Sequence, residues 1–223
     1  MKKYLLPIIL ILIFTVSNDK VTAQTNENLF FVFLNSNPDK EEISEAKVEE
    51  LQKGHLENIG KLQDEGKLFA AGPFDGGGGM FILHAGNIDE AYDFLTTDPA
   101  ISANRFNIEV FPFNICNGDM CGAKEPYTMV TYQLVRLITN SENEEDIRKT
   151  LHDNRFFMAN LANNTDKLVV HGQFNNDNDG VLILNVPDSE TAEQIIKKHP
   201  SVIRGHLNYK VTPLWIAKGT FCD

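Results

Sequence analysis

The sequence predicts an α+β fold of two tandem ferredoxin-like units, each with the element order β-α-β-β-α-β, that together form a pseudo-dimeric α/β barrel. The first observation is an internal repeat, since Lys67–Phe74 and Lys167–Phe174 both run from a Lys-Leu pair to Gly-x-Phe. The second is that a polar or glycine-rich turn and another apolar run follow each copy. Strand and helix patterns also recur in the same order around both copies, which indicates a duplicated unit.

The first unit opens with an apolar, aromatic-rich run over 29–34, which indicates a buried strand. A helix is predicted over 41–65, because apolar positions recur there at spacings of three and four residues. The predicted inner face of this helix comprises Val48, Leu51, His55, Ile59 and Leu62. The remaining elements are strands over 68–74, 80–85 and 106–113 and a short helix over 88–95.

The second unit repeats this order, with predicted strands over 127–138, 168–174, 181–186 and 207–215 and helices over 143–163 and 189–198. One such unit leaves an apolar sheet face uncovered. We therefore expect the two sheets to pack face to face within one chain, with one pocket between them. The expected organisation is a signal segment over 1–23, a first domain over 28–115, a linker over 116–126 and a degenerate second domain over 127–218.

The N-terminal segment has the features of a secretory signal. Lys2 and Lys3 precede an apolar run over 5–16, and Val21-Thr22-Ala23 offers small residues for cleavage before Gln24. The apolar run is shorter than the ~20 residues that a helix needs to cross a bilayer. We expect export to a periplasm or to the outside of the cell, with no stable membrane span after signal removal. The alternative is an uncleaved anchor.

The cysteine pattern leaves two interpretations open. Cys116 and Cys121 lie five positions apart in the linker, and an exported protein can form a disulfide between them. The alternative is two free thiols. Cys222 is then left over near the C-terminus. A zinc site is disfavoured, because the spacing is not C-x2-C and no histidine lies nearby in the sequence.

The charge argues against nucleic acid as a partner. The formal net charge is −11, and no basic stripe interrupts the acidic composition. Phosphate backbones are repelled by such a surface. Hydrophobic residues make up 42% of the chain, which supports packed cores and argues against disorder.

Several short motifs occur together in the first unit: His55 in the long helix, Gly66-Lys67-Leu68, Ala71-Gly72-Pro73-Phe74, Gly79, Ala91, Asp98-Pro99 and Val110-Phe111-Pro112-Phe113. With them the unit resembles the YCII-related family of small ferredoxin-like proteins. That family is similar to dimeric α/β-barrel proteins, which include muconolactone isomerases, and some relatives are dehalogenases of chlorinated muconolactones. The resemblance implies that His55 and Asp98 form a catalytic dyad.

The residues allow a structural interpretation of the same pair. His55 lies in the apolar stripe of its helix, so its imidazole needs a hydrogen-bond partner. Asp98 follows the second helix at a turn and can accept that hydrogen bond. A carboxylate beside an imidazole fixes its tautomer, as a general base requires. The alternative is a core histidine with a purely structural role. Arg105 is a candidate for binding an anionic ligand, or else a charge at the edge of a strand.

The second unit departs from this pattern. Arg155 stands where the first unit has His55, His199 where it has Asp98, and Gln173 where it has Pro73. Arginine does not release its proton, so these residues cannot form a base with a carboxylate partner. We expect at most one dyad per chain, and we expect His171 to be a residue of the sheet face.

Two functions remain from different classes. The first is a cofactor-free lyase or isomerase, in which His55 takes a proton from a carbon beside a carbonyl or lactone group and Asp98 orients the imidazole. This chemistry needs no metal and no organic cofactor. The alternative is a non-catalytic protein of the same fold that binds a small molecule or belongs to the cell envelope. In either case we expect a monomer that acts as a pseudo-dimer, or a higher oligomer.

Overall fold

The computed structural model describes residues 28–175 and 178–222, so the predicted signal segment over 1–23 lies outside the described residues. The first repeat comprises β1 (Leu29–Ser36), α1 (Glu45–Asp64), β2 (Leu68–Pro73), β3 (Gly79–His84), α2 (Ile88–Thr96), α3 (Pro99–Ser102) and β4 (Phe106–Asn117). The second comprises β5 (Met129–Thr139), α4 (Glu144–Asn164), β6 (Leu168–Phe174), β7 (Gly180–Leu184), α5 (Ser189–Ile196), α6 (Pro200–Ile203) and β8 (Leu207–Ala217). The predicted order of strands and long helices is therefore confirmed in both repeats.

Local capping chemistry sets where the helices begin. The hydroxyl of Ser44 accepts a hydrogen bond from the backbone N–H of Lys47, so α1 starts later than the sequence pattern predicts. The one-turn helices α3 and α6 were not predicted. Each begins at a proline that follows a side-chain cap, Asp98 in one repeat and His199 in the other. These caps matter for function because Asp98 belongs to the candidate dyad.

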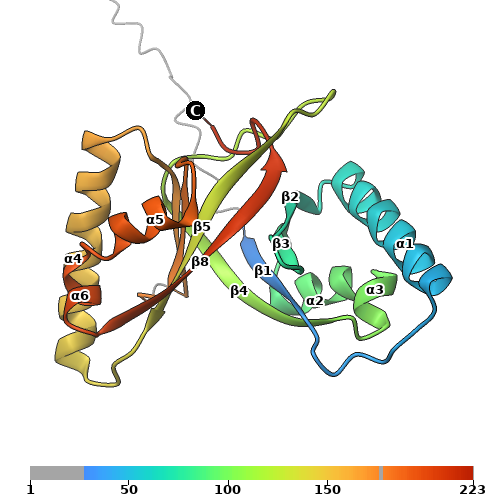
Figure 1. The fold of residues 1–223 in the computed structure, drawn as a ribbon, viewed down its shortest axis with the longest axis horizontal. Helices are drawn as coiled ribbons and strands as arrows, with labels where there is room; N and C mark the ends of the chain where they lie inside the picture. The colour runs from blue at the N-terminus through green and yellow to red at the C-terminus, as the bar shows by residue number, and fades with distance from the viewer. Residues whose placement is uncertain (1–27, 176–177, 223) are drawn as a thin grey trace, which may run out of the picture.

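The strands form one eight-stranded antiparallel sheet in the order β2-β3-β1-β4-β6-β7-β5-β8. The two repeats join where β4 pairs with β6, from Phe113 opposite Phe174 to Asn117 opposite His171. The long helices cover the two outer sides of the strands (Figure 1). This arrangement confirms the predicted α+β fold of two ferredoxin-like units that form an α/β barrel.

The two free edges of the sheet, β2 and β8, come together at a much shorter junction, which has a single isolated bridge between Phe74 and Leu214. Phe74 donates its N–H toward β3, to Gly78, and Asp75 donates toward β8, to Pro213. Successive N–H groups of a strand point to opposite sides, so the next backbone N–H directed at β8 would belong to residue 73. Residue 73 is a proline and has no N–H to donate. Gln173 stands at the matching place in β6, where the β4 ladder continues. Pro73 therefore interrupts pairing at one junction only.

Three cores hold the molecule together. The inner core lies between the repeats and is filled by side chains of both, among them Phe31, Phe113, Phe174 and Leu214. Two outer cores lie between the sheet and the helices of each repeat. The apolar sheet face of each repeat is therefore covered by the other repeat, as predicted. The prediction of one pocket between the sheets is wrong for most of that space, because packed aromatic rings occupy it.

The cysteine prediction was wrong. The disulfide joins Cys121 to Cys222, with a Cα–Cα distance of 5.1 Å, and Cys116 is a free, exposed thiol. The reason is that β4 continues through Cys116, whereas the chain beyond it pairs with the C-terminal segment. Met120 bridges to Phe221, and the N–H of Cys222 donates to the carbonyl of Asp119.

Candidate active site

The imidazole of His55 and the carboxylate of Asp98 meet at the centre of the candidate site. Nδ1 of His55 lies 2.6 Å from Oδ2 of Asp98. His55 projects from the third turn of α1, and Asp98 stands at the start of α3. The structure therefore brings together the two residues that the resemblance implied, across 43 positions of sequence.

Asp98 is held rigidly because both of its oxygens are used. Its side chain is fully buried, and Oδ1 accepts hydrogen bonds from the backbone N–H groups of Ala100 at 2.8 Å and Ile101 at 3.3 Å. Oδ2 is left for His55. An ionised carboxylate can only accept hydrogen bonds, so the contact of the ring with Oδ2 places the proton of a neutral imidazole on Nδ1. The opposite nitrogen, Nε2, then carries the lone pair.

The His55 ring is positioned by aromatic neighbours. It stacks on Phe81, with ring centroids 5.9 Å apart and an interplanar angle of 18°, and Phe106 lies 6.0 Å away. The side chain is 12% exposed, and it lines a pocket. Within the part of the chain that the structure describes, no residue hydrogen-bonds to Nε2. The lone pair of the imidazole is therefore free for a ligand.

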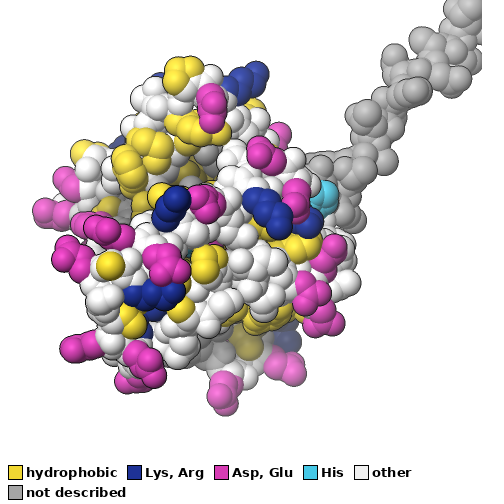
Figure 2. Space-filling model, turned by 90° about the vertical axis from the view of Figure 1, so that its right-hand side faces the viewer, with side chains coloured by type: hydrophobic (Ala, Val, Ile, Leu, Met, Phe, Trp, Pro, Cys, Tyr) yellow, Lys and Arg dark blue, Asp and Glu magenta, His cyan; other side chains and the backbone are white. Residues whose placement is uncertain are grey.

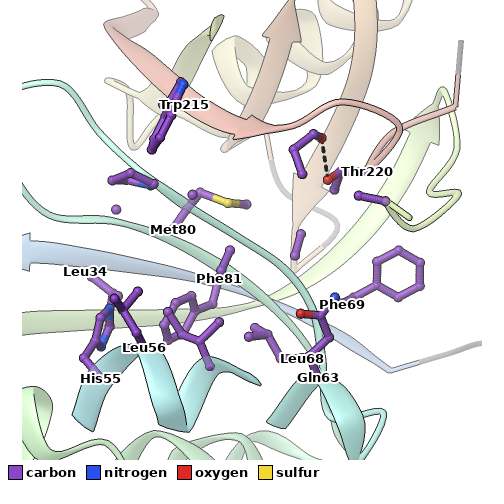
Figure 3. Close-up of a pocket in the computed structure, with 18 of the residues that line it drawn as sticks. Leu34, His55, Leu56, Gln63, Leu68, Phe69, Met80, Phe81, Trp215 and Thr220 are labelled. Atoms are coloured by element: carbon purple, nitrogen blue, oxygen red, sulfur yellow. Dashed lines mark hydrogen bonds between the residues drawn. The ribbon is translucent and has the colours of Figure 1, made fainter. Parts of the chain in front are cut away.

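The pocket that His55 lines has a volume of about 560 Å³. Figure 3 shows His55, Leu56 and Gln63 of α1 on one side and Trp215 on the opposite side, with Met80 and Phe81 between them. The wall opposite α1 comes from the second repeat and its flanking segments: Ala123, Tyr127, Met129, Trp215, Ala217 and Thr220. The site is thus composite, with the dyad from one repeat and the facing wall from the other.

Among the described residues, the lining of the pocket contains no lysine, arginine, aspartate or glutamate. Arg105, the candidate for anion binding, does not line the pocket. Its guanidinium instead donates to the backbone carbonyl of Glu41 at 2.6 Å, in the loop before α1. The structure therefore does not bring Arg105 to the site, because its guanidinium is held by the loop that precedes α1.

The described residues of the second repeat hold no counterpart of the His55–Asp98 pair. His199 is fully buried, and its Nδ1 accepts from the backbone N–H of Ser201. Burial lowers the pKa of His199 to about 4, so the ring is neutral at pH 7 and acts as a helix cap. Asp153, not Arg155, contacts α6, through Ser201 and Arg204. Arg155 and His199 therefore form no imidazole–carboxylate pair at the positions that match His55 and Asp98.

His171 is buried beside this region. Its Nδ1 lies 3.3 Å from Oδ1 of Asn117, and its Nε2 has no partner among the described residues. Burial, and secondarily the neighbouring His199, lower the pKa of His171 to about 4. The first repeat has Ala71 at this position, where it lines the pocket.

Sequence reasoning missed the residues that form the far wall and the contact that supports the dyad. A β-carbon on Gly54 would lie 2.6 Å from Cγ of Pro99, so glycine lets α1 approach the helix that carries Asp98. The signal was present, since a glycine directly before His55 weakens a helix and needs a reason. Nothing in the sequence pattern tied Tyr127 or Trp215 to His55.

We expect Gly54→Ala to lower the free energy of unfolding and to loosen the His55–Asp98 contact. Alanine raises helix propensity by ~1 kcal/mol, but overlap with Pro99 costs about 1–3 kcal/mol. Gly60 lies in the same helix and has no atom within 4 Å of an added β-carbon, so Gly60→Ala is the matched control. That variant should gain about 0.5–1 kcal/mol in urea unfolding. Equal stabilisation of both variants would contradict the close helix contact.

Residues 28–175 and 178–222 hold neither a metal-binding cluster nor a membrane-spanning helix. No group of three or more His, Cys, Asp or Glu side chains there could hold a metal ion. None of the helices in the same residues is long and apolar enough to cross a bilayer.

Comparison with one protein of known structure, a putative chlorite dismutase, agrees with the fold. No curated protein sequence matches the chain. A putative chlorite dismutase of known structure aligns with a TM-score of 0.50 at 8% identity, covering 88% of this chain and 95% of that one. A putative monooxygenase from Lactobacillus acidophilus aligns with a TM-score of 0.47 at 15% identity, covering 88% and 100%. The YCII-related domain matches residues 29–114. The YCII-related match thus coincides with the first repeat, which carries His55 and Asp98.

Proposed function

We propose that this protein is a cofactor-free lyase or isomerase that moves a proton on a small carbonyl or lactone compound bound in the pocket. His55 is the general base, and Asp98 is the residue that positions it. The observation that carries this proposal is the 2.6 Å contact between them at the wall of a pocket of about 560 Å³. A buried carboxylate that orients an imidazole toward a ligand cavity is the arrangement that general-base catalysis requires.

The proposed reaction uses the free lone pair of Nε2. This nitrogen removes a proton from the carbon beside the carbonyl, and the electron pair of the C–H bond moves into an enolate. The imidazolium that forms is stabilised by the Asp98 carboxylate at Nδ1. Return of the same proton to another carbon gives an isomer, whereas expulsion of a leaving group gives a lyase reaction. The amide of Gln52 and the hydroxyl of Tyr127 line the pocket as donors for the carbonyl oxygen, and the amide of Gln63 donates to that hydroxyl.

The conversion of α-angelica lactone to β-angelica lactone tests this chemistry. It needs proton removal beside a lactone carbonyl and proton return at the far carbon, and the conjugated product is followed by ultraviolet absorbance. His55→Gln should reduce the rate to the solvent background. Asp98→Asn keeps a helix-capping side chain but not the carboxylate, so kcat should fall roughly 10²-fold with little change in KM.

His152→Gln is the matched control, because His152 lies on α4 with 83% of its side chain exposed. It should retain full activity. Thermal unfolding of each variant, followed by circular dichroism, separates lost chemistry from lost folding. Unchanged turnover in folded His55→Gln would overturn the proposal. Ligand binding without turnover in the unmodified protein would instead favour the non-catalytic binding protein.

We also propose that the chain is exported and that its signal is removed before Gln24. The residue pattern over 1–23 supports this, and so does the Cys121–Cys222 disulfide, since such bonds persist in oxidising compartments. Mass spectrometry of the full-length gene product in a secreting bacterial host should give a mature chain that starts at Gln24. A product that keeps residues 1–23 and fractionates with membranes would contradict it.

A further inference from the structure

We infer that the pocket selects uncharged, largely apolar ligands and that the second repeat, which carries no dyad, determines this selectivity. This inference rests on the site proposed above and names its substrate class. It follows from the exposure, the charge and the connectivity of the pocket walls.

Exposed hydrophobic side chains gather at this pocket. Leu56 is 58% exposed, Trp215 52%, Tyr127 45% and Met129 36%, and all four line it. Figure 2, which looks onto the side of the first repeat, shows hydrophobic side chains gathered in the upper part of that face and acidic ones mostly around its rim. Large apolar side chains left in contact with water around a cavity mark a binding site for an apolar partner.

The polar groups of the lining are few, and several are already paired. The hydroxyl of Thr220 donates to the carbonyl of Ala217 at 2.8 Å, and the amide of Gln63 lies 3.4 Å from the hydroxyl of Tyr127. Because the described lining holds no lysine or arginine, a carboxylate ligand that left water would find no permanent positive charge there. The Asp98 carboxylate behind His55 would repel it further. The pocket therefore disfavours anions.

The second repeat reaches the dyad because the β2–β8 junction is interrupted. Pro73, Trp215 and Ala217 all line the pocket, and they lie where a continued ladder would pair the two strands. The matching stretch at the other junction is closed by pairing of β4 with β6. Gly72 still packs closely against this edge, because a β-carbon there would lie 2.8 Å from the backbone oxygen of Trp215. The unpaired edge of β8 beside Pro73 thus forms a wall of the site, and its residues contact whatever His55 acts on.

Two matched probes test the selectivity: acetylnaphthalene, which is neutral, and acetylnaphthoate, which adds a carboxylate to the same ring system. Trp215 is the one tryptophan of the chain and lines the pocket, so quenching of its fluorescence reports binding there. We expect the neutral ketone to bind with a Kd at least about tenfold lower than that of the carboxylate. Equal or tighter binding of acetylnaphthoate would overturn the inference.

Substitutions inside and outside the pocket test whether the probe binds there. Met129→Ala and Leu56→Ala should each weaken acetylnaphthalene several-fold, whereas Phe156→Ala should not. Phe156 is the counterpart of Leu56 in the second repeat and is 70% exposed outside the pocket. Met129→Lys should narrow or reverse the preference for the neutral probe by supplying the missing cation. If none of these variants changes the affinity, the assignment of selectivity to this wall is wrong.

The test of ligand selectivity can succeed or fail independently of the test of the proposed reaction. His55→Gln should keep the preference for the neutral probe while losing lactone isomerisation. A pocket that prefers acetylnaphthalene but catalyses nothing would support the ligand class and overturn the lyase or isomerase assignment. Turnover that depends on His55 together with a preference for the carboxylate probe would do the reverse.

Discussion

Replacing Cys121 and Cys222 with serine is expected to lower the free energy of unfolding by about 4 kcal/mol. The two cysteines are 101 positions apart, so their bond closes a loop that contains the whole second repeat. In the chain-entropy account, a loop of about 100 residues loses ~4.7 kcal/mol of unfolded-state entropy when it is closed. The same bond ties the C-terminal segment to the linker, where Phe221 is buried in the inner core.

Urea unfolding of the double variant at neutral pH, beside the unmodified protein with and without a reducing agent, measures this effect. Cys116→Ser is the matched control, because Cys116 is a free, exposed thiol and its loss should change stability by less than about 0.5 kcal/mol. The double variant should also bind acetylnaphthalene more weakly, since Ala123 and Thr220 beside the bond line the pocket. A double variant as stable as the oxidised protein would show that strand pairing alone holds these segments.

Lowering the pH from about 7 to about 4 is expected to destabilise the protein by several kcal/mol. Burial lowers the pKa values of both His171 and His199 from 6.5 to about 4. Between those values the unfolded chain binds protons that the folded chain excludes, so the free energy of unfolding falls as the pH falls. The largest contribution of each histidine is about 3 kcal/mol, from roughly 1.4 kcal/mol per pH unit.

His199→Asn isolates one of the two groups. Asparagine also caps helices, so α6 should be retained while the titrating ring is removed. Urea unfolding across the pH range should then show a shallower loss of stability, by up to half. His152→Asn, at an exposed position, should leave the slope unchanged. If the free energy of unfolding of His199→Asn falls with pH as steeply as that of the unmodified protein, other groups dominate the loss of stability in acid. Glu109, whose pKa is lowered by Arg136, is one such group.

Most of the fold could be predicted from the sequence, because the evidence is local and occurs twice. The apolar runs, the helical spacing and the Gly-x-Phe endings are properties of neighbouring residues, and duplication of Lys67–Phe74 at Lys167–Phe174 gave each element an independent check. Element ends were less predictable, since capping by Ser44 and Asp98 depends on single side chains. Val48 was predicted on the inner face of α1 but is 46% exposed.

Features that join distant segments were harder to predict. Cys116 and Cys121 are close in sequence, but strand pairing carries them apart and brings Cys222 to Cys121. The far wall of the pocket depends on which edge strands meet, and that is a property of the closed barrel. The His55–Asp98 pair was proposed from family resemblance, since neither residue alone marks a site.

The interruption at Pro73 has a consequence for how such a molecule could arise. In a symmetric homodimer the two junctions between the sheets are identical, so a substitution that disrupts strand pairing at one junction disrupts it at both. A chain that carries both repeats can change the two junctions separately. Gln173 lies within the continuous β4–β6 ladder, whereas the β2–β8 junction beside Pro73 has a single isolated bridge. Within one chain, the second repeat can therefore change the wall that it contributes to the pocket without changing the repeat that carries His55 and Asp98.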